Sequence, residues 1–254
     1  MTEILFTLFR HALRSLLRLR VLYLKTLRLG PHGEPASHLT PEQLETLKHG
    51  DGRFKRLEEA KIPQPTESSC SVASVACVIN AMERGKTIEN QMDLLEVIRA
   101  GHWKERLSPE GWKGRRGLPL DVLGRVVPAA LFHHGIKAEV EVIPFYASQS
   151  LQERVDRVRG TLDLFREKEN TYLIAHFDQG AFLPLLTIPH ISPVGHWNPD
   201  TMRVTMLDVD PDQPVPYEVS LTRFTEGISS HYGGLLRPYG YSHGGLVLIS
   251  VKSL

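Results

Sequence analysis

The sequence predicts an α+β fold, in which a helical N-terminal half is followed by a mainly antiparallel sheet. Between residues 40 and 132, apolar residues recur at helical spacing or fill long blocks of small side chains. After residue 137, short runs alternate between apolar and polar residues, and turn-forming residues precede some of them. Helices that precede the strands, instead of alternating with them, are typical of α+β domains.

The helical half begins with a capping box. Thr40 and Gln43 stand at its two positions, and Pro41 occupies the first helical position, so a short helix should run to about Leu47. Residues 51–69 are polar, and no regular element is predicted there. Residues 71–82 are apolar on most sides and rich in small side chains, which predicts a buried helix. Further helices are expected over residues 91–100, over 120–132 and, after a second capping box at Ser150, from 151 to about 168.

Four strand patterns follow in the second half. They cover residues 137–143, 171–177, 202–207 and 245–251. The third of these strands is preceded by the turn-forming residues Asn198, Pro199 and Asp200. If a hairpin joins this strand to the segment around His190, then His190 lies beside Asp208, which comes directly after the strand.

Composition and charge exclude several classes of protein. The chain has 254 residues, of which 41% are hydrophobic and 23% charged, as in ordinary globular proteins. Its net charge of +1 gives no indication of nucleic-acid binding. Only Cys70 and Cys77 are cysteines, which excludes a disulfide framework and fits a reducing, cytoplasmic location. The apolar run near the N-terminus is too short for a membrane span and lacks the pattern of a signal peptide.

The N-terminus has a separate character. Residues 4–28 form an amphipathic helical pattern, in which Arg10, Arg14 and Arg18 make a basic stripe beside a Leu- and Phe-rich face. Such a helix suits the inner face of a membrane or a partner protein, which we expect residues 1–30 to contact; packing on its own domain is the alternative. A linker rich in Gly, Pro and His follows. Residues 1–38 are therefore predicted as a basic helix and linker, and residues 39–254 as the main domain, which carries the candidate residues described next.

Cys70 is the first candidate for chemistry. It follows a polar loop and opens the small-residue helix, so that the helix dipole and free N–H groups favour its thiolate form, as a nucleophile requires. The alternative is that Cys70 is a small buried hydrophobic residue, which is our interpretation of Cys77 inside the helix. Gln64, six residues before Cys70, has an amide that could donate a hydrogen bond to a developing oxyanion.

His190 is the candidate partner of that thiol. A thiol nucleophile needs an imidazole that takes its proton and returns it to the leaving group, and the imidazole needs a third group that orients it. Asp208, eighteen residues after His190, is the expected orienting group, with Asp210 as the second choice. A metal site formed by these residues and His196 is an alternative, but its spacing matches no recognised ligand signature. We expect no metal and no cofactor.

Several segments together resemble the phytochelatin synthases, a papain-like family of cysteine transpeptidases. The matching segments are QPTESSC (64–70), CSVASVACVINAM (70–82), HISPVG (190–195), MLDV (206–209) and GLVLIS (245–250). The separation of six residues between glutamine and cysteine, and of eighteen between histidine and aspartate, also agree with the family. The resemblance covers about residues 60–251.

The resemblance implies a papain-like cysteine protease fold and a catalytic triad. Cys70 would be the nucleophile, His190 the base and acid, and Asp208 the orienting group, while Gln64 would support the oxyanion. Family members form a γ-glutamylcysteinyl-enzyme from glutathione with release of glycine, and they pass the acyl group to a second thiol peptide or to water. Members without a Cys-rich C-terminal extension act mainly as hydrolases, and we expect this chain to behave like them.

Three positions depart from the family pattern. Ser71 stands where the family has glycine after its nucleophile, and Pro211 and Gln179 stand where it has arginines in the substrate-binding region. Loss of two fixed cations weakens recognition of an anionic peptide. We therefore assign Ser71, Gln179 and His196 to substrate binding, and we expect the substrate contacts to differ from those of the family.

Two interpretations of the function follow. The first is acyl transfer or amide hydrolysis through a Cys70 thioester on a glutathione-type γ-glutamyl peptide. The second is a diverged acyltransferase with another donor or acceptor, such as a carrier-protein or lipid-linked group, which works at a membrane surface. Both predict a small peptide or acyl substrate, no nucleic acid, and a cytoplasmic enzyme that is peripheral to the membrane if the N-terminal helix binds there. A binding module that uses the fold only as a scaffold is the non-enzymatic alternative.

Overall fold

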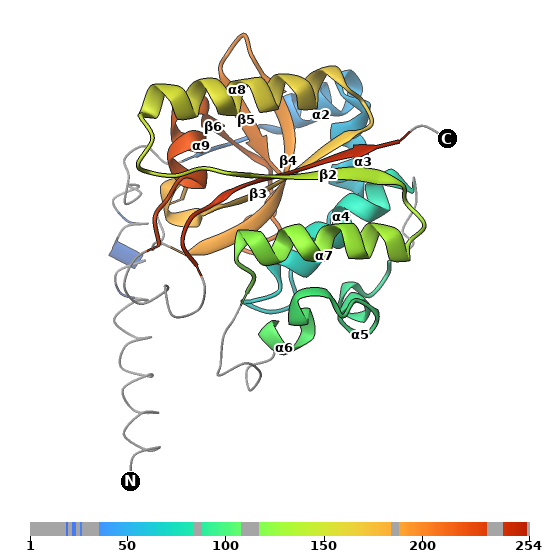
Figure 1. The fold of residues 1–254 in the computed structure, drawn as a ribbon. Helices are drawn as coiled ribbons and strands as arrows, with labels where there is room; N and C mark the ends of the chain where they lie inside the picture. Colours follow the sequence, from blue (N-terminus) through green and yellow to red (C-terminus); the bar gives the residue numbers. More distant parts are fainter. Residues whose placement is uncertain are drawn as a thin grey trace.

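The protein combines one antiparallel sheet with helices on both of its faces (Figure 1). The structure, a computed structural model, describes residues 36–83, 88–107, 117–183, 188–232 and 241–252, and the single residues Leu19, Leu22, Tyr23 and Thr26. These four residues are helical, but the rest of the predicted helix over residues 4–28 and most of the linker lie outside the described residues. No helix in the described part has the length and hydropathy that a membrane crossing requires.

The sheet has seven strands in the order β1-β6-β5-β4-β3-β7-β2, and all of its neighbouring pairs are antiparallel. The strands are β1 (Ser37–His38), β2 (Ala138–Pro144), β3 (Thr171–Asp178), β4 (Pro189–Asn198), β5 (Arg203–Met206), β6 (Tyr217–Ser220) and β7 (Gly245–Val251). The C-terminal strand β7 lies between β3 and β2, and so joins the two parts of the sheet that flank it (Figure 1). The antiparallel α+β arrangement expected from the sequence is therefore present.

The described helices precede, separate and follow these strands. They are α2 (Pro41–Gly50), α3 (Gly52–Ala60), α4 (Cys70–Met82), α5 (Leu94–Val97), α6 (Trp103–Leu107), α7 (Leu120–His133), α8 (Leu151–Glu167) and α9 (Leu221–Ile228), with short 3-10 turns η1 (Gln91–Asp93), η2 (Ala100–His102) and η4 (Gln179–Ala181). Both predicted capping boxes are formed, at Thr40 for α2 and at Ser150 for α8. Helices α4 and α7 cover one face of the sheet and α8 and α9 the other (Figure 1).

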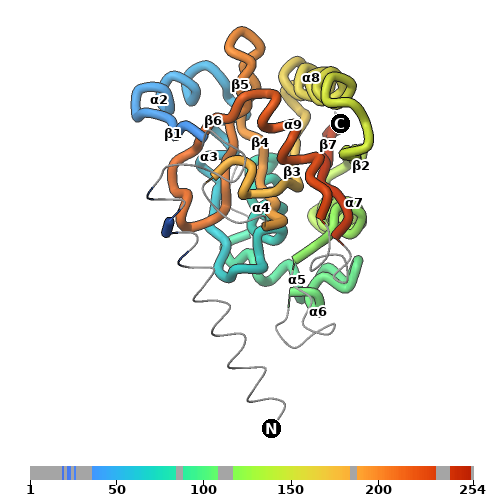
Figure 2. Tube along the Cα trace, turned by 90° about the vertical axis from the view of Figure 1, so that its left-hand side faces the viewer, coloured from blue at the N-terminus to red at the C-terminus, as the bar shows by residue number. Residues whose placement is uncertain are grey.

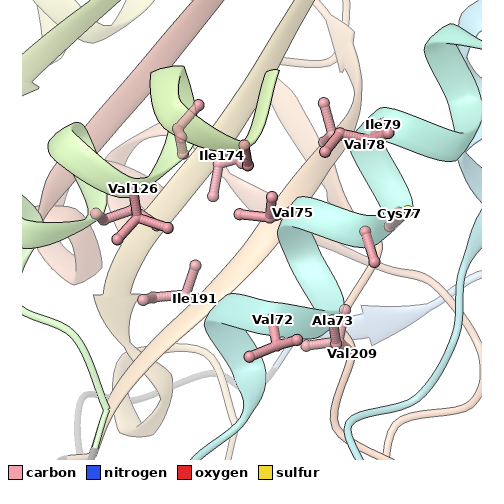
Figure 3. Packing of buried hydrophobic residues seen from close by; sticks show 14 of the residues in the cluster. Val72, Ala73, Val75, Cys77, Val78, Ile79, Val126, Ile174, Ile191 and Val209 are labelled. Carbon is pink, nitrogen blue, oxygen red and sulfur yellow. The ribbon is translucent and has the colours of Figure 1, made fainter. Parts of the chain in front are cut away.

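Apolar side chains fill the space on both faces of the central strands. Along β3, Tyr172 and Ile174 pack in the cluster that contains α4 and α7, whereas Leu173 and Ala175 pack in the cluster that contains α8 and α9. Figure 3 shows Ile174 and Ile191 directed toward the valines of α4. Because every residue of β3 is buried, its middle part, residues 172–175, is continuously apolar instead of alternating.

Helix α3 corrects the expectation that residues 51–69 are irregular. Asp51 caps this helix, and its carboxylate accepts hydrogen bonds from the N–H groups of Arg53 and Phe54. Phe54, Leu57 and Ala60 then form a buried stripe on a helix whose other residues are mostly polar. The guanidinium of Arg53 is also buried, where it donates to the carbonyl oxygens of residues 168 and 171 at 3.0 Å each. The polar composition therefore concealed a short amphipathic helix.

The predicted helix over residues 91–100 is also corrected. It is divided into η1, α5 and η2, because Ile98 takes an extended conformation and Gly101 has a φ of 62°. Strand β6 and helix α9 were not predicted, although Ser220 caps α9 by accepting from the N–H of Arg223.

In the view of Figure 2, α4 lies in the centre of the molecule, close to the sheet. The helix that begins with Cys70 is thus held by packing along its whole length, since residues 70–81 are all buried.

Candidate functional site

The N-terminus of α4 fixes the position of Cys70. Ser69 precedes the helix, and its carbonyl oxygen accepts from the N–H groups of Val72 and Ala73, so that the first turn is closed around the cysteine. The hydroxyl of Ser74 lies 2.8 Å from the carbonyl oxygen of Cys70 and 2.9 Å from that of Ile191 on β4. One buried hydroxyl thus links the turn that holds the cysteine to the strand that holds His190.

The hairpin of β4 and β5 brings His190 to Asp208. His190 is the second residue of β4, and the chain returns through β5, which pairs with β4 and ends two residues before Asp208. The ring nitrogen Nε2 of His190 lies 2.6 Å from Oδ1 of Asp208. Both residues are buried, with exposed fractions of 4% and 1%. The hairpin expected from the sequence accounts for this contact between residues far apart along the chain.

Cys70 lies beside these two residues. Its thiol acts on the His190 ring, and since Nε2 faces Asp208, the remaining nitrogen Nδ1 is the one available to sulfur. Burial lowers the pKa of His190, but the charge and hydrogen bond of Asp208, followed by the contact with Cys70, raise it well above 6.5. The ring therefore favours the protonated form, which suits a group that holds a proton taken from a thiol.

Asp208 is held by more contacts than the sequence indicated. The hydroxyl of Tyr217 donates to Oδ2 at 2.7 Å, and the N–H of Asp210 donates to Oδ1 at 2.9 Å. Burial raises the pKa of Asp208, but the positive charge of His190 and these hydrogen bonds outweigh it and lower the pKa to about 2. The carboxylate thus stays ionised and can orient the imidazole.

Ser192 adds a further contact at the same point. Its hydroxyl lies 3.1 Å from Nε2 of His190, donates to Oδ1 of Asp208 at 3.2 Å, and accepts from the N–H of Val209 at 3.3 Å. Ser192 stands two residues after His190 on the same strand, so strand alternation could have identified it. Strand β4 was not predicted, and neither was β6, which carries Tyr217, so both residues were missed.

A partly buried lysine holds the backbone beside the carboxylate. Lys61, directly after α3, donates through Nζ to the carbonyl oxygens of Asp208 at 3.3 Å and of Pro214 at 3.0 Å. Burial lowers the pKa of Lys61, and the charge of Asp208 only partly opposes this. Sequence reasoning missed Lys61, because a lysine in a polar segment is usually solvated.

Gln64 lies on a loop that is attached next to Asp208. Its N–H donates to the carbonyl oxygen of Val209 at 2.8 Å. The side-chain Oε1 is buried and has no hydrogen-bond partner among the residues that the structure describes. The same loop leads to Cys70 within six residues, so it connects the cysteine to the segment that holds Asp208.

The three residues assigned to substrate binding lie in different surroundings. Ser71 is buried, and its hydroxyl accepts from the indole N–H of Trp103 at 3.0 Å. Gln179 donates to Oδ2 of Asp210 at 2.9 Å, which connects it to Asp208 through the backbone of Asp210.

His196 lies six residues beyond His190 on β4, and its Nδ1 lies 2.8 Å from Oδ2 of Asp51, the cap of α3. It is therefore not brought to Cys70. Asp208, and not Asp210, contacts the His190 ring.

The other cysteine has a different environment. Cys77 is fully buried in α4, its sulfur lies 3.3 Å from the carbonyl oxygen of Leu57, and burial raises its pKa to about 12. As for metals, no group of three or more His, Cys, Asp or Glu side chains is placed to hold an ion in the part of the chain that the structure describes. Of the two thiols, Cys70 is the one that acts on a histidine, since no histidine contributes to the raised pKa of Cys77.

Comparisons with known proteins give little further information. No family model matches the chain, and no curated protein matches it. Among solved structures, the Pseudomonas avirulence protein AvrPphB is similar with a TM-score of 0.33 and 12% sequence identity, over 78% of this chain and 100% of that one. A likeness at this level does not bear on function. What the chain itself provides is an α+β fold with Cys70, His190 and Asp208 assembled at one site.

Proposed function

We propose that the protein is a cysteine-nucleophile enzyme of papain-like type, which catalyses acyl transfer or amide hydrolysis through a thioester on Cys70. The observation that supports this most strongly is the buried group in which Cys70 acts on the His190 ring and His190 is hydrogen-bonded to Asp208. A nucleophile, a base and an orienting carboxylate in this order are the requirements of covalent acyl-transfer catalysis.

In the first step, the thiol proton of Cys70 passes to Nδ1 of His190, and the sulfur attacks the carbonyl carbon of the donor amide. The resulting imidazolium is stabilised by the ionised carboxylate of Asp208, 2.6 Å from Nε2. His190 then gives its proton to the leaving nitrogen. The carbon–nitrogen bond breaks, an amine is released, and the acyl group stays on sulfur as a thioester.

The negative charge that develops on the carbonyl oxygen needs hydrogen-bond donors. The N–H of Cys70 lies in the first turn of α4, where N–H groups have no acceptor within the helix. The side-chain amide of Gln64 is the second donor in this proposal, since its loop runs from the Asp208 segment to Cys70. Two such donors contribute more to a developing oxyanion than to the neutral carbonyl of the substrate.

In the second step, His190 accepts a proton from water or from the amino group of an acceptor. The activated group attacks the thioester carbon, the carbon–sulfur bond breaks, and the proton returns to the sulfur of Cys70. Water gives a free acid, and an amine acceptor gives a new amide. The same residues therefore serve hydrolysis and transfer, and access of the acceptor decides between them.

For the donor, we propose a glutathione-type γ-glutamyl peptide, which would be cleaved to a γ-glutamylcysteinyl-enzyme and glycine. The support is the resemblance of the segments around Cys70, His190 and Asp208 to the phytochelatin synthases. Gln179, in place of an arginine of that family, is engaged with Asp210. Because this position lacks the fixed positive charge of the family, the acceptor of the acyl group can differ from the family's acceptor.

Intact-mass spectrometry of the purified protein with glutathione tests this proposal. We expect an acid-quenched sample to carry an adduct equal in mass to a γ-glutamylcysteinyl group, which is absent in Cys70→Ala and present in Cys77→Ala. A thioester is removed by hydroxylamine, whereas a mixed disulfide with whole glutathione is heavier and is removed by a reductant. If the only adduct is the mixed disulfide, glutathione is not the acyl donor. If no amide or thioester donor acylates Cys70, the enzymatic proposal itself is wrong.

A further inference from the structure

Three buried aromatic residues form a cluster at the end of β3 that the proposed mechanism does not use. The ring centroids of His176 and Tyr232 are 5.9 Å apart, those of His176 and Tyr241 are 5.8 Å apart, and those of the two tyrosines are 5.9 Å apart. The exposed fractions of His176 and Tyr232 are 0% and 1%. Each ring thus contacts the other two, and the polar atoms of two of them are enclosed.

Two polar atoms of this cluster have no hydrogen-bond partner among the described residues. They are Nδ1 of His176 and the hydroxyl oxygen of Tyr232. A buried polar group without a partner destabilises the folded state, so such groups are rare in native proteins unless they bind something. Their occurrence in adjacent rings indicates a shared ligand.

The contacts of His176 determine which group it offers. Its Nε2 lies 3.1 Å from the carbonyl oxygen of Leu118, which only accepts, so Nε2 carries the hydrogen. Burial lowers the pKa of His176 to about 4, and the ring is therefore neutral at neutral pH. In this tautomer Nδ1 has a lone pair and accepts a hydrogen bond. The hydroxyl of Tyr232 is the complementary group, because it can donate.

The cluster lies close to the proposed nucleophile. Burial raises the pKa of both tyrosines. For Tyr241 a charge on Cys70 is the next cause, and for Tyr232 it follows the charges of Asp178 and Tyr241. His176 likewise feels the charge of His190, and it stands one residue before Phe177, which pairs with His190 across β3 and β4. A group held by the cluster would therefore be part of a molecule that also reaches Cys70.

We propose that His176 and Tyr232 bind a neutral amide of the acyl donor, with the amide N–H donating to Nδ1 of His176 and the amide carbonyl accepting from the hydroxyl of Tyr232. This inference rests on the proposed function, because it takes the ligand to be the donor of the Cys70 thioester. It identifies His176 and Tyr232 as specificity-determining residues. Both offered groups are uncharged, so the subsite selects an amide over a carboxylate or an ammonium group. In glutathione the matching group is the amide between the γ-glutamyl and cysteinyl residues.

A trapped water bonded to both atoms is the competing explanation, and stability separates the two. If the Tyr232 hydroxyl has no partner in the free protein, Tyr232→Phe removes an unfavourable buried group and raises the melting temperature. If a water satisfies the hydroxyl, the same substitution lowers it. Tyr172→Phe is the matched control, since Tyr172 is a buried tyrosine four residues before His176 on the same strand.

The experiment measures binding of glutathione by calorimetry to Cys70→Ala, which cannot form the thioester, alone and combined with Tyr232→Phe or Tyr172→Phe. We expect Tyr232→Phe to weaken binding of glutathione about tenfold or more, because a donor to the ligand is lost. The same substitution should raise the melting temperature, because it removes an unpaired buried hydroxyl. Tyr172→Phe should leave binding unchanged. Glutathione methylated on the cysteinyl amide nitrogen cannot donate to His176. Its affinity for Cys70→Ala should therefore be as low as the affinity of unmodified glutathione for Cys70→Ala combined with Tyr232→Phe.

Unchanged affinity in Tyr232→Phe overturns the inference, and a lowered melting temperature would then assign the cluster to a trapped water. Failure of glutathione to bind Cys70→Ala also overturns it. The proposed function is judged separately, by the mass of the adduct on Cys70 in the otherwise unchanged protein. Acylation of Cys70 together with unchanged affinity in Tyr232→Phe would retain the enzyme and reject this subsite.

Discussion

His176 should make the folded protein sensitive to mild acid. Its ring is fully buried, and its Nε2 hydrogen bonds to the carbonyl of Leu118, so that protonation places a charge in the interior. In the unfolded chain the residue binds a proton below its ordinary pKa of 6.5, whereas in the folded protein it does so only below about 4. As the pH falls from 6.5 to about 4, the unfolded state gains a proton that the folded state lacks, and the free energy of unfolding decreases.

The size of this effect follows from the two pKa values. Their difference of about 2.5, at about 1.4 kcal/mol for each pH unit, gives a loss of roughly 3 kcal/mol over the full range. A loss of this size is a large share of the stability of an ordinary domain. The substitution His176→Gln removes the titrating group and leaves an amide that can still donate to Leu118.

Urea denaturation of the unmodified protein and of His176→Gln, at several pH values from about 7.5 down to about 4, measures the effect. The two proteins should show a constant difference in unfolding free energy above neutral pH. Below pH 6.5 the unmodified protein should lose stability faster, until the gap has changed by roughly 3 kcal/mol. Parallel pH profiles would refute the reasoning, and with it the neutral His176 on which the proposed amide subsite depends.

Three further substitutions test the contacts around the candidate site. Tyr217→Phe removes a donor to Asp208 and should lower the unfolding free energy, measured by denaturation, by about 1–3 kcal/mol. It should also lower the rate of Cys70 acylation, and an unchanged rate would show that Asp208 is held without Tyr217. Lys61→Met removes two bonds to the carbonyls of Asp208 and Pro214 and should slow acylation while the protein stays folded by circular dichroism, and full activity would contradict this. Cys77→Ala should keep acylation and lose about 1 kcal/mol of stability through a small cavity, so loss of activity would place the wrong thiol in the mechanism.

The predicted elements were those with strong local signals. The capping boxes at Thr40 and Ser150 and the small-residue block of α4 each appear as expected, because they depend on residues within one or two turns. Helix α3 was missed because its stabilising contacts are distant. The buried guanidinium of Arg53 is held by carbonyl groups more than a hundred residues away, and such partners leave no local pattern.

The candidate site shows the same division. The contact of His190 with Asp208 was predictable, since a turn signal stands between two segments that pair as neighbouring strands. The hydroxyl of Tyr217 reaches Asp208 from strand β6, which was not predicted. The ammonium of Lys61 reaches Asp208 from the end of helix α3, which was not predicted either. His190 was assigned by its chemistry and its spacing from Asp208, although strand β4 was not predicted, whereas Tyr217 and Lys61 stand in no comparable pattern.

Ser71 and His196 stay predictions as substrate-binding residues, and the structure shows what each of them contacts. Ser71 follows the cysteine in the chain, but on a helix successive side chains point in different directions, and its hydroxyl faces Trp103. His196 is near His190 in sequence, yet six residues of extended strand carry it to the cap of α3.

The central claim is that His190 activates Cys70, and alkylation by iodoacetamide at neutral pH tests it without knowledge of the substrate. Iodoacetamide reacts with thiolates, and peptide mapping reports the rates at Cys70 and Cys77 separately. We predict that Cys70 is modified first, and that Cys77 stays unmodified in the folded protein because burial raises its pKa to about 12. The substitution His190→Gln should slow modification of Cys70 roughly tenfold or more. Equal rates at Cys70 with and without His190, in proteins that are both folded, would contradict the assignment.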